Sequence, residues 1–89
     1  MNSQITRGFA KALEKLPPRI QQRTHAVLRT WAADPFHKGL HFKQAATAHN
    51  VWSIRIGRRH RALAFRAGND ISWYWVGDHD AYMKLLSRR

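Results

Sequence analysis

The chain has 89 residues, enough for one domain with a single small core and too few for two domains. Its 16 Lys and Arg stand against five Asp and Glu, and the formal net charge of +11 favours a polyanionic partner, either nucleic acid or an acidic protein. The absence of cysteine excludes disulfide bonds and thiolate metal sites. Because no apolar run is long enough for a signal peptide or a membrane span, we expect a cytoplasmic protein.

Two helices are predicted near the start of the chain, after a weak strand signal at residues 2–6. The first helix has apolar residues at helical spacing from Phe9 to Leu16 and ends at Pro17-Pro18, where a proline can also open the next helix. The second has an apolar stripe from Ile20 to Trp31 and ends near Asp34-Pro35. Together they predict a helical hairpin whose core residues are Phe9, Leu13, Leu28 and Trp31.

The second half of the chain has the alternating pattern of β-strands. Residues 39–43 predict a short strand with Leu40 and Phe42 on one side, and residues 45–50 predict a loop. Three further runs, 52–56, 61–66 and 71–75, are joined by short turn-like segments and predict an antiparallel meander. Either face of the middle run is a candidate for burial.

A short C-terminal helix completes the prediction. Asp78 can cap its first turn, and Tyr82, Leu85 and Leu86 form its apolar stripe. The order of elements predicts one α+β domain over residues 1–89, with the helical hairpin packed on one face of a small antiparallel sheet.

Cationic side chains gather in a window without any Asp or Glu, between Pro35 and Asn69. Alternation of arginines with aromatic residues on a sheet makes a candidate surface for RNA. The residues that we expect to bind nucleic acid are Lys43, Arg55, Arg58, Arg59 and Arg66. Trp52, Trp73 and Trp75 can stack bases, although a domain of this size needs most of them for its core.

The sequence resembles the RelE/ParE toxin superfamily of bacterial toxin–antitoxin modules over nearly the whole chain. The resemblance rests on the order and spacing of four segments, FAKALEKLPPRIQ, DPFHKGLHFK, VWSIRIGRRHRAL and WYWVGDHDAYMKLL. Two positions depart from the family pattern. His60 stands where an aromatic residue usually precedes the strand arginine, and the third strand offers Ser72 and Tyr74 where RelE-type nucleases place an arginine.

The resemblance implies a cognate antitoxin, which we expect to be acidic and to contain a DNA-binding part. In the RelE branch it implies cleavage of mRNA on the ribosome, and in the ParE branch it implies poisoning of DNA gyrase. Arg61 matches the family's strand arginine, and His79 with Tyr82 matches its C-terminal pattern.

Four residues are candidates for metal-independent RNA cleavage, which needs a base, an acid and a cation beside the phosphate. We assign Arg61 to phosphate stabilisation, together with Arg55, and proton transfer to His60, His79 or Tyr82. Structural roles stay open for all three: a turn position for His60, a helix-start hydrogen bond for His79 and core packing for Tyr82. We expect no cofactor and no metal, because the six dispersed histidines lack the spacing of zinc ligands.

The sequence supports one hypothesis and leaves two rivals open. We interpret the chain as a toxin that acts as a ribosome-dependent mRNA endonuclease and inhibits translation. The first rival is a gyrase inhibitor without a catalytic centre, which the missing third-strand arginine favours. The second is a non-enzymatic RNA-binding module, which rests on net charge alone.

Overall fold

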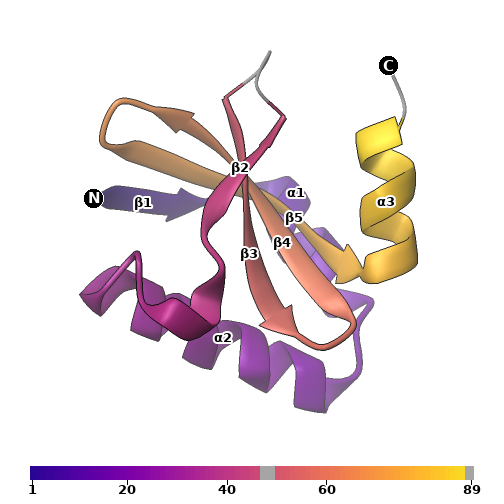
Figure 1. The fold of residues 1–89 in the computed structure, drawn as a ribbon. Helices are drawn as coiled ribbons and strands as arrows, with labels where there is room; N and C mark the ends of the chain where they lie inside the picture. The colour runs from indigo at the N-terminus through magenta and orange to yellow at the C-terminus, as the bar shows by residue number, and fades with distance from the viewer. Residues whose placement is uncertain (47–49, 88–89) are drawn as a thin grey trace.

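A five-stranded sheet forms the centre of the computed structural model, which describes residues 1–46 and 50–87 (Figure 1). The elements follow the order β1 (Asn2–Ile5), α1 (Arg7–Glu14), α2 (Pro18–Ala33), η1 (Lys38–Leu40), β2 (Lys43–Ala46), β3 (Val51–Gly57), β4 (His60–Ala67), β5 (Asp70–Asp78) and α3 (His79–Ser87). The strand order is β1-β5-β4-β3-β2. Strands β2 to β5 pair antiparallel, and β1 pairs parallel to β5. The predicted α+β class, helical hairpin and meander are confirmed. The sheet is mixed and not purely antiparallel as predicted, because the N-terminal segment, which had only a weak strand signal, forms β1 and pairs parallel to β5.

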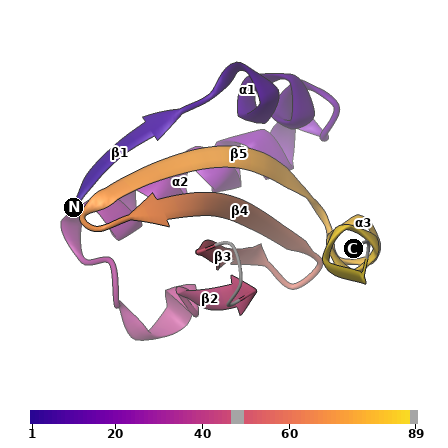
Figure 2. The ribbon, with the colours of Figure 1, turned by 90° about the horizontal axis from the view of Figure 1, so that it is seen from above.

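Helices α1 and α2 lie together on one face of the sheet (Figure 2). The Thr6 side chain caps α1 by accepting a hydrogen bond from the Phe9 N–H (3.2 Å), and Pro18 opens α2 in its first turn. Within the described residues, no helix combines the length and the apolar character that a bilayer crossing requires.

The main core lies between this helical hairpin and the sheet. Phe9, Leu13 and Trp31 are buried in it as predicted, and Leu28 packs against it while partly exposed. Sheet residues that face the hairpin include Ile54, Ala62, Ala64 and Trp73. Trp73 is therefore a core residue, whereas Trp52 and Trp75 are only partly buried.

Helix α3 covers part of the opposite face of the sheet, which we call the open face. A second apolar cluster forms there from Val51, Leu63 and Tyr82. Strand β4 is consequently covered on both sides near its middle, by the helical hairpin over Ala62 and Ala64 and by α3 over Leu63. Arg61 and Phe65 lie on the open face before and after Leu63, because alternate residues of a strand share a face.

The short strand predicted at residues 39–43 is wrong in position. Residues 38–40 form the turn η1, in which Nδ1 of His37 accepts a hydrogen bond from the Gly39 N–H (3.3 Å), and His41 takes a left-handed conformation with φ of 50°. The strand therefore starts at Lys43 and occupies part of the predicted loop, of which residues 47–49 lie outside the described part of the chain. Leu40 and Phe42 still enter the same core.

Candidate functional site

The candidate cations of the sheet divide between its two faces. Arg55 and Arg61 are register partners on β3 and β4, and both lie on the open face. Lys43 is the partner of Ser53 in the β2–β3 pair, which puts Lys43 on the open face as well. Arg66 lies on the other face, where its guanidinium stands 4.6 Å from the centre of the Trp52 ring. The predicted nucleic-acid surface is therefore split, and Arg66 does not share it with Arg61.

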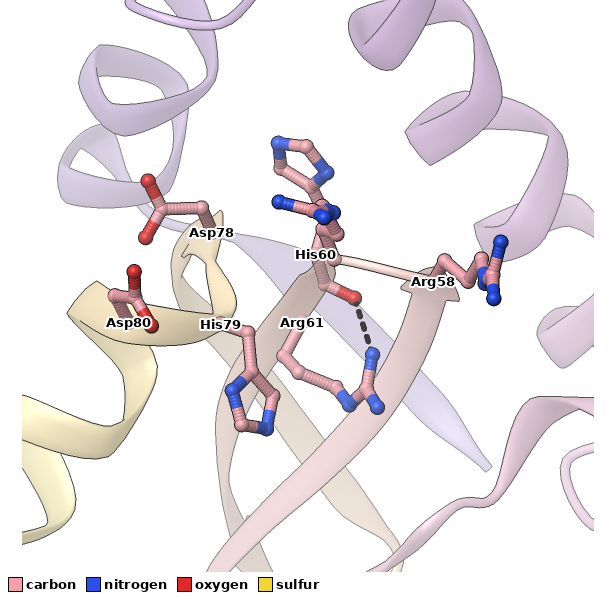
Figure 3. A pocket seen from close by; sticks show the side chains of 7 residues that line it. Arg58, His60, Arg61, Asp78, His79 and Asp80 are labelled. Atoms are coloured by element: carbon pink, nitrogen blue, oxygen red, sulfur yellow. Dashed lines mark hydrogen bonds between the residues drawn. The ribbon is translucent and has the colours of Figure 1, made fainter.

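A hollow of about 590 Å³ lies where the β3–β4 turn meets the junction of β5 and α3. Its lining contains four cationic or histidine residues from the turn and three residues from the junction: Arg58, Arg59, His60, Arg61, Asp78, His79 and Asp80. Figure 3 shows that Arg61 and His79 extend to one side of this hollow, while His60 and Asp78 extend to the other. The strand pairing agrees, because His60 is the register partner of Asp78.

Arg61 is anchored by one nitrogen of its guanidinium. Its Nη1 donates hydrogen bonds to the carbonyl oxygens of Gly57 (2.8 Å) and His60 (2.9 Å), which fixes the side chain across the β3–β4 turn. In the described part of the chain, no acceptor bonds to Nε or Nη2. These two nitrogens form the edge with which arginine binds two oxygens of a phosphate. The anchored geometry therefore suits an anion-binding role.

His79 is held by the first turn of α3. Its backbone N–H donates to the carbonyl oxygen of Arg59 (2.6 Å), and the side chain of Asp78 caps the helix by accepting from the Ala81 N–H (2.8 Å). The predicted cap at Asp78 is thus confirmed. The imidazole of His79 lies 5.9 Å from the Tyr82 ring, centre to centre, and the residue is exposed to solvent.

Tyr82 belongs to the apolar cluster under α3. It is 9% exposed and packs with Val51 and Leu63, and its hydroxyl lies 3.5 Å from Oγ of Ser53. Its phenol therefore points into the sheet. Packing accounts for its position, and its catalytic role stays a prediction.

Two aromatic residues that the sequence analysis did not select also lie on the open face. Phe65 and Tyr74 stack with their ring centres 4.3 Å apart, and Phe65 is 48% exposed. The alternation of residues along β4 puts Phe65 on the same face as Arg61, but this pattern does not predict which face of the sheet is exposed. Among the described residues, no three His, Asp or Glu side chains come close enough to hold a metal ion.

A profile of the ParE-like toxin domain matches residues 18–84, most of the chain. The chain belongs to the ParE-like toxin family. The resemblance inferred from the sequence is therefore confirmed at the level of the family. No curated protein matches the chain.

Solved toxin structures share the fold of this ParE-like toxin. The RelB–RelE antitoxin–toxin complex from Methanococcus jannaschii contains a chain with a TM-score of 0.73 and 18% identity, and the match covers 91% of this chain and 95% of that one. The RelBE2 complex from Mycobacterium tuberculosis gives 0.70 and 20%, with 86% and 95% covered. The YoeB/ParE toxin from Agrobacterium tumefaciens gives 0.67 and 18%, with 89% and 99% covered. At these identities the likeness shows the fold alone.

The role of Tyr82 in this toxin is open to a direct test by removing its hydroxyl. Tyr82→Phe is expected to keep activity within about twofold of wild type and to lower the stability by less than about 1 kcal/mol, because the 3.5 Å contact with Ser53 is long for a hydrogen bond. Thermal unfolding and growth arrest on induction measure the two effects. A stable Tyr82→Phe protein that has lost its toxicity would show that the Tyr82 hydroxyl is needed as a proton donor.

Proposed function

We propose that this ParE-like toxin inhibits translation by cleaving mRNA on the ribosome without a metal ion. The observation that carries the proposal is the placement of Arg61 and His79 on the same side of the hollow (Figure 3). Metal-independent cleavage needs a base to activate a ribose 2′-OH, a cation to stabilise the phosphate charge, and a proton for the leaving 5′-oxygen, which water can supply. The imidazole of His79 can supply the first, and the Nε and Nη2 edge of Arg61 can supply the second. Arg55, across the β3–β4 pair, adds charge beside Arg61.

A specific observation favours inhibition of DNA gyrase as the second candidate function. His60 extends away from Arg61, and Tyr82 is buried, so His79 is the exposed proton-transfer candidate on the side of Arg61. In addition, the third strand of the meander carries Ser72 and Tyr74 where RelE-type nucleases place an arginine. A binding inhibitor would need no second proton-transfer group.

The two functions are separated by parallel assays of the purified toxin. One assay follows cleavage of mRNA on programmed ribosomes together with in vitro translation, and the other follows DNA supercoiling by gyrase. Cleaved mRNA with unaffected supercoiling would support the proposal. Intact mRNA with blocked supercoiling would transfer the assignment to the gyrase inhibitor.

We also propose that an acidic antitoxin neutralises this toxin. The related complexes from M. jannaschii and M. tuberculosis pair a toxin with an antitoxin, and the formal charge of +11 on this chain complements an acidic segment. The contact surface proposed is the basic window between Lys38 and Arg66, which includes the open-face cations Lys43, Arg55 and Arg61.

Antitoxin binding is expected to weaken as the salt concentration rises. Exposed charges are screened over about 8 Å at physiological ionic strength, and higher salt shortens this distance. The dissociation constant, measured by titration calorimetry at several salt concentrations, should therefore rise steadily. The double variant Lys43→Ala/Arg55→Ala should weaken binding a few-fold and flatten the salt dependence, while the double variant Arg19→Ala/Arg29→Ala, at exposed positions of α2, serves as the control matched in charge. Equal effects of both variants would contradict the placement of the contact.

A further inference from the structure

Phe65 and Tyr74 form a stacked aromatic pair on the open face, in which Phe65 is exposed and Tyr74 is partly buried. The two rings come from neighbouring strands, β4 and β5, and are inclined by only 17° with their centres 4.3 Å apart. Tyr74 thus covers one face of the Phe65 ring, while about half of the Phe65 side chain (48%) stays accessible to solvent. By contrast, the aromatic residues Phe9, Trp31, Phe42 and Trp73 of the main core are at most 7% exposed.

Sheet stability alone explains the contact between the two rings but not the exposure of one of them. A cross-strand aromatic pair stabilises a sheet by about 0.2–1 kcal/mol relative to alanines. Helix α3 buries Leu63, two residues before Phe65 on the same face, yet it leaves Phe65 uncovered. The pair therefore offers an apolar ring surface on a face that also carries Arg55, Arg61 and Lys43.

We propose that the Phe65–Tyr74 pair stacks a nucleobase of the single-stranded RNA whose phosphate lies on Arg61. Aromatic side chains on an open sheet face are the usual means by which sheet-based RNA-binding domains hold unpaired bases. This inference rests on the proposed function and adds to it a binding subsite outside the hollow.

The spacing of the two parts fits one short stretch of RNA. Arg61 and Phe65 lie on the same face of β4, four residues apart, which corresponds to about 13 Å along a strand. Leu63 lies between them and is covered by α3, so the RNA would pass beside this helix. A phosphate contact at one end and a base contact at the other would fix the register of the RNA relative to His79.

The phenol of Tyr74 adds a hydrogen-bond donor to the aromatic surface. A phenol with the ordinary pKa of 10.0 already keeps its proton at neutral pH, and burial raises the pKa of this one further. A protonated phenol can donate to a base edge or to a ribose oxygen. Stacking itself tolerates every base, so we expect the pair to set affinity more than sequence preference.

The test compares two exposed phenylalanines on different faces of the toxin. Phe65→Leu removes the ring but keeps an apolar side chain, and Phe65→Tyr keeps the ring. Phe36→Leu is the matched control, since Phe36 is 59% exposed and lies beside Phe42 on the helix-facing side. The probe is an mRNA on programmed ribosomes with 2′-O-methyl groups, which block cleavage by the 2′-OH, and with 2-aminopurine at successive positions, because its fluorescence is quenched by stacking.

Wild type, Phe65→Tyr and Phe36→Leu are expected to bind the probe alike and to quench 2-aminopurine at one position. Phe65→Leu is expected to raise the dissociation constant on the order of 5- to 150-fold and to abolish that quenching. A Phe65→Leu protein that binds and quenches like wild type overturns the subsite while leaving the proposed function standing, provided that wild type cleaves mRNA. If Phe65→Leu weakens binding of the antitoxin but not of the RNA, the aromatic pair is a contact for the antitoxin, and the RNA subsite is overturned. A wild type that neither binds the probe nor cleaves mRNA overturns the subsite and the proposed function together.

Discussion

Arg61→Ala is expected to lower mRNA cleavage by about 10²–10³-fold and to abolish growth arrest while leaving the toxin folded. If Arg61 stabilises the developing phosphate charge as a donor in an oxyanion hole does, its loss costs about 2.7–4 kcal/mol in the transition state. The folded state also loses the two partly buried hydrogen bonds of Nη1 to Gly57 and His60, which contribute about 1–3 kcal/mol together. A domain of this size has about 5–15 kcal/mol of stability, so the variant should still fold. Single-turnover cleavage on ribosomes and thermal unfolding measure the two effects separately.

The same strand offers a matched control for this arginine. Arg66→Ala removes an equal charge from the opposite face of β4, where the guanidinium stacks on Trp52. It should lower stability slightly and leave cleavage near the wild-type rate. Arg61→Lys, which keeps the charge but loses the two-nitrogen edge, should fall between wild type and Arg61→Ala. An Arg61→Ala protein that is stable and still cleaves would remove Arg61 from the proposed site.

Local patterns in the sequence were sufficient to predict the helices, the meander and the C-terminal helix. The alternation of the strand pattern was also sufficient to predict that His60 and Arg61 lie on opposite faces of the sheet, because neighbouring residues of a strand point to opposite faces. It did not say which face was open. Leu63 on one side and Ala62 with Ala64 on the other are all buried, since helices pack on both faces of β4 at this point.

Other features depend on contacts that no short window of sequence contains. Strand β1 pairs with β5 nearly seventy residues away, as in the register pair of Asn2 with Asp70, so its partner and its parallel direction were not readable locally. The turn η1 forms because His37 bonds to the Gly39 backbone and His41 takes a positive φ, which overrides a weak alternation. The Phe65–Tyr74 stack likewise joins two strands and becomes visible only once their register is known.

Trp31→Ala is expected to unfold the toxin at temperatures where Arg61→Ala stays folded. Trp31 is 1% exposed and makes edge-to-face contacts with Phe42 (5.6 Å between ring centres) and Trp73 (5.3 Å), so it joins α2 to the sheet. Truncating a buried tryptophan costs about 3–5 kcal/mol, a large part of the stability of a small domain. At about 4–8 °C per kcal/mol, the midpoint of thermal unfolding should fall by at least about 12 °C.

A phenylalanine at this position separates ring packing from the polar part of the indole. The buried Nε1 of Trp31 has no hydrogen-bond partner among the described residues, so Trp31→Phe removes a donor whose desolvation opposes folding. Its loss of stability should therefore be clearly smaller than that of Trp31→Ala, although it also leaves a cavity. Near its unfolding midpoint, the Trp31→Ala protein should lose mRNA cleavage in proportion to the unfolded fraction. The Arg61→Ala protein, by contrast, should be inactive while it is fully folded. Equal stability of Trp31→Ala and wild type would contradict the core that joins α2 to the sheet.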